Sequence, residues 1–272
     1  MVRCGVLLLG LVLPAAALGQ SPVGAPVGVH TSYRTYAAGI PVAEVDAGLN
    51  LGPWSYQMQL AYHTTGLVGF FYSGHQQDTV SGAFNGEQVR PSRYMGEGFW
   101  RGRNRAVEID YARGHPTIRL LVPSNDEERE PVPEDMRNGT VDNLSALVQL
   151  IHVVVATGRC DTAVRTFDGR RLVDIRARTV GEEELPPTDR SSFSGKALRC
   201  DFEGRMLAGF LHDDDRGRDS RPMHGSAWLA RALPGSIPMP VRMTFETRWF
   251  GDATMYLTDV GPGGDLRVAS GR

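Results

Sequence analysis

Apolar and polar residues alternate along most of the chain. Residues 43–51 read Ala-Glu-Val-Asp-Ala-Gly-Leu-Asn-Leu, with the apolar residues at the odd positions. A second run follows the turn signal Gly52-Pro53 and places large apolar side chains at every other position: Trp54, Tyr56, Met58, Leu60 and Tyr62. A period of two is typical of strands that bury one face, and two such runs around a tight turn predict an antiparallel hairpin.

Turn signals of the same kind recur between other candidate strands. They are Asn85-Gly86, Gly114-His115, Asp168-Gly169 and Gly251-Asp252. Asn-Gly and Asp-Gly pairs supply the positive φ angles that tight hairpin turns require. Repeated hairpins predict one large antiparallel sheet, and because strand twist accumulates, a sheet of about ten strands or more curls. The predicted fold class is therefore mainly β, with a large curled antiparallel sheet that forms an open barrel or cup.

One segment departs from the period of two. Between residues 142 and 157 the apolar side chains follow helical spacing and cover most of the circumference: Leu144, Leu147, Val148, Leu150, Ile151, Val153, Val154 and Val155. Asp142 is a suitable N-cap and Gly158 a suitable end. Because a helix that is apolar on most sides must be buried, we expect one buried helix at 142–157 on the concave side of the sheet. The charged, proline-rich stretch 124–138 predicts a solvent-exposed loop.

The N-terminus has the composition of an export signal. Arg3 precedes an apolar run at residues 5–13, and small residues lead up to Gly19. This pattern is typical of a secretory signal peptide, here cleaved after Gly19, and its apolar run is shorter than the roughly 20 residues that span a bilayer. No later segment is apolar for about 18 residues, so no transmembrane segment is expected after cleavage. We expect a single β-rich domain over residues 20–272.

The cysteine count agrees with export. Removal of the leader removes Cys4 and leaves Cys160 and Cys200. Two cysteines in an oxidising compartment usually pair, whereas two lone cysteines without nearby histidines make a poor zinc site. Two free thiols are the other alternative. We expect a Cys160–Cys200 disulfide, which closes a loop of about 40 residues and stabilises the fold by about 4 kcal/mol on the chain-entropy estimate.

Composition and motifs exclude several classes of function. The chain has 29 basic and 31 acidic residues, and loss of Arg3 with the leader leaves 28 basic ones and a net charge of −3. That balance excludes a general basic surface for nucleic acid or anionic lipid. The sequence contains no nucleophile elbow, zinc-protease helix, phosphate loop or dinucleotide-binding loop. It therefore predicts no catalytic residue, no metal ligand and no cofactor, and we expect a protein that is not an enzyme.

The acidic cluster Asp213–Asp215 is the basis of an alternative. Hard cations prefer several carboxylates, so this cluster could belong to a metal-dependent enzyme. The neighbouring Arg216 and Arg218 would compete with a metal for the same oxygens, which favours a solvated loop with ion pairs.

The alternating apolar row also has two interpretations. It can be ordinary core packed under the helix, or it can line a cavity that accepts an acyl chain or a hydrophobic peptide. A half-open sheet with a helical plug is a geometry that allows such a cavity. The expected lining is Trp54, Tyr56, Met58, Leu60 and Tyr62 from the strand, with Leu147 and Ile151 from the helix.

Short motifs appear in a characteristic order between Tyr33 and Thr258. They are Tyr33-x-x-Tyr36-x-x-Gly39-Ile40-Pro41-Val42-Ala43-Glu44, Thr65-Gly66-Leu67, Pro91-x-x-Tyr94, Asp142-x-Leu144-Ser145-Ala146-Leu147, Phe167-Asp168-Gly169-Arg170-Arg171 and Ala197-Leu198-Arg199-Cys200. In this order the chain resembles the exported proteobacterial family of domain of unknown function 3108. Lys196 departs from the proline expected at its position.

The resemblance implies a periplasmic β-rich protein without known catalytic residues. More distantly, the expected architecture is similar to the lipoprotein carriers and other β-spiral periplasmic proteins, although a shared fold does not determine function. From the export signal, the alternating strands and the buried helix, we expect a non-enzymatic envelope protein that binds an acyl chain, a lipoprotein or a peptide, or that acts as an envelope-integrity scaffold.

Overall fold

The computed structural model describes residues 27–66, 69, 73–100, 102–213, 216–247 and 251–263, and the leader predicted at residues 1–19 lies outside them. The described strands form one 13-stranded sheet. Their bounds are β1 Val27–Ala37, β2 Ile40–Leu51, β3 Ser55–Thr64, β4 Gly74–Asn85, β5 Gln88–Trp100, β6 Arg103–Ala112, β7 His115–Val122, β8 Thr162–Phe167, β9 Leu172–Leu185, β10 Gly195–Ala208, β11 Met223–Ala230, β12 Met239–Thr247 and β13 Gly251–Pro262.

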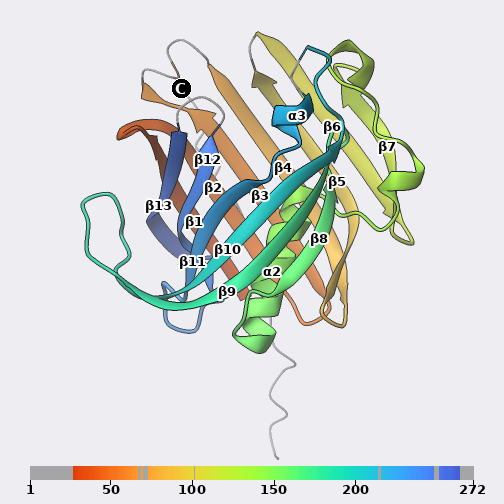
Figure 1. Ribbon diagram of the computed structural model, residues 1–272. Helices are drawn as coiled ribbons and strands as arrows, with labels where there is room; N and C mark the ends of the chain where they lie inside the picture. The colour runs from red at the N-terminus through yellow and green to blue at the C-terminus, as the bar shows by residue number, and fades with distance from the viewer. Residues whose placement is uncertain are drawn as a thin grey trace, which may run out of the picture.

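The sheet is curled and not closed. Its strand order is β7-β6-β5-β4-β3-β2-β1-β13-β12-β11-β10-β9-β8, so β7 and β8 are its two ends. Neighbouring strands are antiparallel throughout. The sheet bends back on itself, so that β8 and β9 pass on one side of the helix α2 (Asn143–Thr157) and β3–β5 pass on the other (Figure 1). This arrangement confirms the predicted fold class.

Most of the predicted turns lie where the turn signals placed them. Gly86, with a φ of 61°, follows β4, and the β6–β7 turn uses Arg113 and Gly114, both with positive φ. The latter turn therefore lies one residue earlier than Gly114-His115. The predicted turn at Gly251-Asp252 is wrong. Gly251 is the first residue of β13 and pairs with Thr247 of β12. The connection at 248–250 lies outside the described residues.

The helix α2 confirms the predicted helix and its ends. The Asp142 side chain accepts a hydrogen bond from the Ser145 N–H, and Gly158 adopts the left-handed conformation that ends the helix. Leu144, Val148 and Ile151 are at most 6% exposed. Because α2 contacts β3, β4, β5 and β8, it lies in the concave side of the sheet and joins the two halves of the core.

The segment between β7 and α2 corrects the prediction of a solvated loop. It contains two short 3₁₀ turns, η1 (Asn125–Glu127) and η2 (Asp135–Arg137), and Val132 is 1% exposed. The Arg129 side chain donates to the Gly209 carbonyl. Part of the segment is therefore packed into the core, which its charge and proline content did not indicate, whereas more than half of residues 124–138 are exposed, as predicted.

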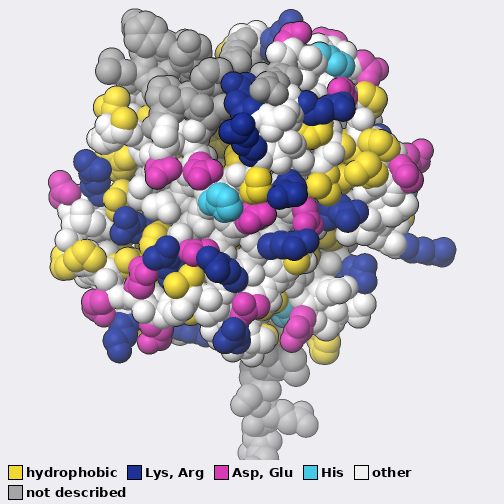
Figure 2. All heavy atoms as spheres, in the orientation of Figure 1, with side chains coloured by type: hydrophobic (Ala, Val, Ile, Leu, Met, Phe, Trp, Pro, Cys, Tyr) yellow, Lys and Arg dark blue, Asp and Glu magenta, His cyan; other side chains and the backbone are white. Residues whose placement is uncertain are grey.

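The outer face over β9 and β10 carries interleaved basic and acidic side chains (Figure 2). Arg199 Nη1 lies 2.8 Å from Glu183 Oε1, and Arg178 Nη2 lies 3.4 Å from Asp201 Oδ2. This face is solvated, as expected for the outer side of a half-buried sheet. Within the described residues, no helix combines the length and the apolar character that a membrane crossing requires.

Candidate functional site

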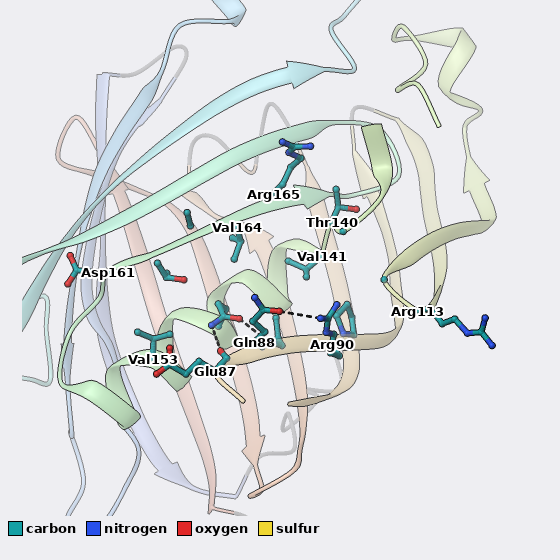
Figure 3. Close-up of a pocket in the computed structure, with 17 residues that line it drawn as sticks. Glu87, Gln88, Arg90, Arg113, Thr140, Val141, Val153, Asp161, Val164 and Arg165 are labelled. Atoms are coloured by element: carbon teal, nitrogen blue, oxygen red, sulfur yellow. Dashed lines mark hydrogen bonds between the residues drawn. The ribbon is translucent and has the colours of Figure 1, made fainter. Parts of the chain in front are cut away.

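A hollow of about 710 Å³ lies between the start of β5 and the end strand β8. We call this hollow the seam. Figure 3 shows Glu87, just before β5, and Arg90 of β5 on one side, Val164 and Arg165 of β8 on the other, and α2 between them. Its floor includes Gln149 and Val153 of α2. The seam is thus the place where the curled sheet fails to close.

On one side of the seam, β8 has a free backbone edge. The Val141 N–H donates to the Arg165 carbonyl, and the Phe167 N–H donates to the Val141 carbonyl. Odd-numbered residues of β8 therefore turn their backbone groups away from β9. Since the β8–β9 register is continuous, the N–H and carbonyl of Ala163 and the N–H of Arg165 face the seam. The described part of the chain supplies no partner to them.

On the opposite side, α2 has already occupied the edge of β5. The Gln149 side chain accepts from the Val89 N–H at 2.8 Å and donates to the Glu87 carbonyl. Gln149 is only 5% exposed. Its amide thus acts as a peptide group of a neighbouring strand, and it satisfies backbone groups that would otherwise be buried without partners. The two walls of the seam are therefore unequal, because Gln149 bonds to the Val89 N–H and the Glu87 carbonyl of the β5 wall, whereas the described residues supply no partner to Ala163 of the β8 wall.

The segment 139–141 closes one end of the seam. The Gly139 N–H donates to the Gly114 carbonyl in the β6–β7 turn, while Val141 pairs with β8. This segment therefore links the two ends of the sheet. Beyond it, towards Ala163, the seam remains open.

The rim of the seam is basic. Arg90, Arg113 and Arg165 line the hollow, and no described carboxylate forms an ion pair with them. Arg113 points away from the hollow in Figure 3. Glu87 is an unpaired acid, whereas Asp161 accepts from Thr179 and pairs with Arg159, which holds the pKa of Asp161 below its ordinary value. With Arg113 turned away, Arg90 and Arg165 exceed the unpaired Glu87 by one positive charge, and this balance favours a ligand that carries negative charge.

The disulfide fixes the chain immediately before β8. Cys160 and Cys200 are bonded, with their Cα atoms 5.8 Å apart, and both are fully buried. The Cys160 N–H also donates to Thr179 Oγ1 of β9 at 2.8 Å. This confirms the predicted pairing and shows what the bond does locally: it holds the free half of β8 in place.

The predicted cavity lining is mostly packed core. Tyr56, Met58 and Ile151 are at most 1% exposed. Burial, partly offset by a hydrogen bond with Ser145, raises the pKa of Tyr56. Leu60, Tyr62 and Leu147 are partly buried. Trp54 differs from the prediction, because it precedes β3 and is 76% exposed.

The structure bears only in part on the acidic cluster. Among the described residues, no three His, Cys, Asp or Glu side chains are placed to hold a metal ion. Asp214 and Asp215 lie outside the described residues. The metal-dependent alternative therefore remains a prediction.

Sequence reasoning missed the residues that make the seam. Gln149 gave a usable signal, because it is a polar side chain within an otherwise apolar helix. Ala163 and Arg165 gave none, because a free edge depends on which strands are neighbours.

Comparison with known proteins identifies the family. Residues 32–258 match the family described as "Protein of unknown function (DUF3108)". The chain belongs to this family. A search of curated proteins finds no match to this DUF3108 chain.

Two solved structures are similar to the DUF3108 chain. The first is a beta-barrel-like protein of domain of unknown function DUF1849 from Brucella abortus, with a TM-score of 0.53 and 13% identity over 87% of this chain and 98% of that chain. This likeness concerns the fold alone. The second is a domain from Vibrio parahaemolyticus described as an outer membrane lipoprotein-sorting protein, with a TM-score of 0.25 and 9% identity over 89% of this chain and 88% of that chain.

Proposed function

We propose that this chain is a non-catalytic binding protein of the periplasm, whose seam takes up an extended, acidic segment of an envelope protein. The segment adds to β8 as a further strand. The single observation that carries the proposal is the free backbone edge at Ala163, which faces a hollow floored by α2. A strand edge of this kind offers main-chain hydrogen bonds that give affinity, while the surrounding side chains give specificity.

The lining of the seam fits an extended polypeptide. Successive side chains of an added strand point alternately to the two faces of the sheet. On the inner face they meet Val89, Val153 and Val164, which suit small apolar side chains. On the outer face they lie near Arg90 and Arg165, which suit aspartate or glutamate.

An acyl ligand has less support from the geometry. Tyr56, Met58 and Ile151 were expected to line an apolar cavity, but they are packed between the sheet and α2. The seam, by contrast, mixes valines with charged and amide groups. Such a lining costs an acyl chain the desolvation of polar groups that it cannot hydrogen-bond.

Location in the periplasm is supported by two features. The leader pattern at residues 1–19 is that of an export signal. A buried disulfide between Cys160 and Cys200 belongs to an oxidising compartment.

The test uses the mature protein and a short peptide of alternating valine and aspartate. We expect this peptide to bind and to slow hydrogen exchange at the Ala163 and Arg165 amides. A peptide of alternating valine and lysine should bind at least about tenfold more weakly, because the arginines repel it. Ala163→Pro removes the N–H at an end strand, where proline is tolerated, and should abolish binding. Ala163→Ser retains the N–H and should bind normally.

Three outcomes would overturn the proposal. They are no binding of the acidic peptide, equal binding by Ala163→Pro, and protection of amides outside β8 alone. Lipid in protein purified natively from the periplasm, detected by mass spectrometry, would favour an acyl ligand instead.

A further inference from the structure

A second hollow, of about 820 Å³, lies on the concave face where β3–β6 pass the first residue of α2, Asn143. We call it the polar cleft. Its lining includes Gln76, Asp78 and Tyr94 from the sheet, Arg129 from the segment before α2, and Arg170 from the turn between β8 and β9. Unlike Ser145 and Gln149, whose polar groups bond to the sheet at the helix, these side chains line an open hollow.

The sheet side of the polar cleft presents a carboxylate. Asp78 accepts hydrogen bonds from Gln76 Nε2 at 2.8 Å and from the Tyr94 hydroxyl at 3.1 Å, and no described arginine or lysine pairs with it. Burial raises the pKa of Asp78 despite these two hydrogen bonds. Gly96 makes room for this arrangement, because a Cβ there would lie 2.3 Å from Asp78 Oδ1.

Two arginines of the cleft, Arg129 and Arg170, form no ion pair with any described carboxylate, although Asp168 and Glu128 lie near both. Other arginines of the cleft are paired, since Arg105 binds Glu128 and Arg171 binds Asp168. Arg129 donates to the carbonyl of Gly209, and Arg170 donates to the carbonyl of Pro123.

Burial and neighbouring arginines lower the pKa of both groups, against the opposing effect of the nearby Asp168 and Glu128. Burial, with a contribution from the neighbouring Arg171, lowers the pKa of Arg129. Burial, with a contribution from Arg105, lowers the pKa of Arg170. An anion bound in the cleft would favour the charged form of both groups.

We propose that the polar cleft binds a small zwitterion. Its ammonium group meets the Asp78 carboxylate, and its carboxylate or phosphate meets Arg129 and Arg170. The shared chemistry is a primary amine and an oxyanion on one small molecule, as in a free dipeptide or in phosphoethanolamine. A cleft that holds an unpaired carboxylate and two arginines without ion pairs fits a ligand that carries both charges, whereas a single ion would pair with only one kind of group. The site is separate from the seam and does not depend on the seam being occupied.

Isothermal titration calorimetry of the mature protein tests this site. The two zwitterionic probes are alanylalanine and phosphoethanolamine, and the single-charge probes are ethanolamine and inorganic phosphate. We expect at least one zwitterion to bind about tenfold or more tightly than either single-charge probe. Alanylalanine and phosphoethanolamine also distinguish a peptide source from a lipid-headgroup source.

Variants assign the two ends of the ligand. Asp78→Asn and Arg170→Gln should each weaken zwitterion binding about tenfold, in line with the loss of one charge-assisted hydrogen bond. Arg176→Gln is the matched control, because Arg176 is an exposed arginine on β9 outside the cleft. Ala163→Pro, which alters the seam, should leave zwitterion binding unchanged. Melting temperatures of all variants separate a lost contact from a lost fold.

The proposal is overturned if neither zwitterion binds, or if phosphate alone binds as tightly as phosphoethanolamine. It is also overturned if folded Asp78→Asn and Arg170→Gln bind the zwitterions as the wild type does.

Discussion

The buried carboxyl of Asp142 gives a sharp test of how the helix is anchored in the sheet. Asp142 is fully buried at the N-terminus of α2. Its Oδ1 accepts from the Ser145 N–H at 2.8 Å, and its Oδ2 accepts from the Ser145 hydroxyl at 2.6 Å. The Tyr56 hydroxyl lies 2.7 Å from Ser145 Oγ, which connects this cap to β3. No described arginine, lysine or histidine forms an ion pair with Asp142.

The size of this contribution to the free energy of unfolding follows from the pKa of Asp142. Burial outweighs the hydrogen bonds from Ser145 and raises the pKa of Asp142 to about 6, against about 3.9 in an unfolded chain. The folded protein therefore binds this proton more tightly than the unfolded chain does. The contribution to stability is fully present below about pH 4 and is lost as the pH rises to about 6, at a cost of about 3 kcal/mol.

Asp142→Asn isolates this contribution. The asparagine oxygen can still accept from the Ser145 N–H, and its amide can donate to Ser145 Oγ as a protonated carboxyl would. We expect the unfolding free energy of the variant, relative to wild type, to rise by about 2.5 kcal/mol between about pH 4 and pH 7.5. Other titrating groups cancel in this difference.

Urea unfolding of the wild type and of Asp142→Asn at about pH 4 and pH 7.5 measures this difference in unfolding free energy. Asp142→Ala is the control, because it loses the cap at every pH and should be destabilised by about 1–2 kcal/mol even at low pH. A difference between Asp142→Asn and wild type that does not change with pH would refute the reasoning, since the carboxyl would then be as easily ionised in the fold as in water.

Three further predictions concern the core and its links. Cys160→Ser should lower the melting temperature by roughly 10 °C under oxidising conditions, and an unchanged value in a thermal scan would contradict the role of the bond. Gln149→Leu leaves the Val89 N–H and the Glu87 carbonyl without partners and should cost about 2–4 kcal/mol in urea unfolding. Met58→Ala should cost about 2–5 kcal/mol, whereas Trp54→Ala should change stability by less than about 0.5 kcal/mol; equal costs would contradict their burial.

The elements were predictable because their signals are local. Asp142 and Gly158 bound the helix through hydrogen bonds and backbone angles within a few residues of themselves. Asn85-Gly86 determines a turn in the same way. Closing the sheet, in contrast, depends on how twist accumulates over all the strands, and the alternation of apolar residues predicts only that the sheet curls.

The errors arose where alternation does not determine which residues pair. Trp54 continues the period of two, but it belongs to the turn, where the Gly52 N–H donates to the Ser55 carbonyl. The sequence Gly251-Asp252 is typical of a turn, and yet these two residues are the first paired residues of β13. In both cases the strand boundary depends on the partner strand, which the local sequence does not contain.

The polar cleft had a signal that alternation alone did not use. Residues 74–79 read Gly-His-Gln-Gln-Asp-Thr, so this strand is polar on both faces. A strand within a curled sheet has one face towards the core, and a polar inner face there is costly unless the side chains have partners. Arg129 and Arg170 could not be placed opposite it, because their positions depend on the segments before α2 and after β8.

The seam remains open because the fold assigns the edge of β5 to another partner. β5 pairs with β6 only from Arg93 onwards, so its first residues lack that neighbour. Gln149 of α2 takes the hydrogen bonds at Glu87 and Val89, and β8 therefore cannot pair with β5 to close the barrel. The segment 139–141 bonds to β8 only at Arg165 and Phe167. The N–H and carbonyl of Ala163, towards the start of β8, have no partner among the described residues. An added strand must consequently pair with β8, and it lies in the seam over the helix α2.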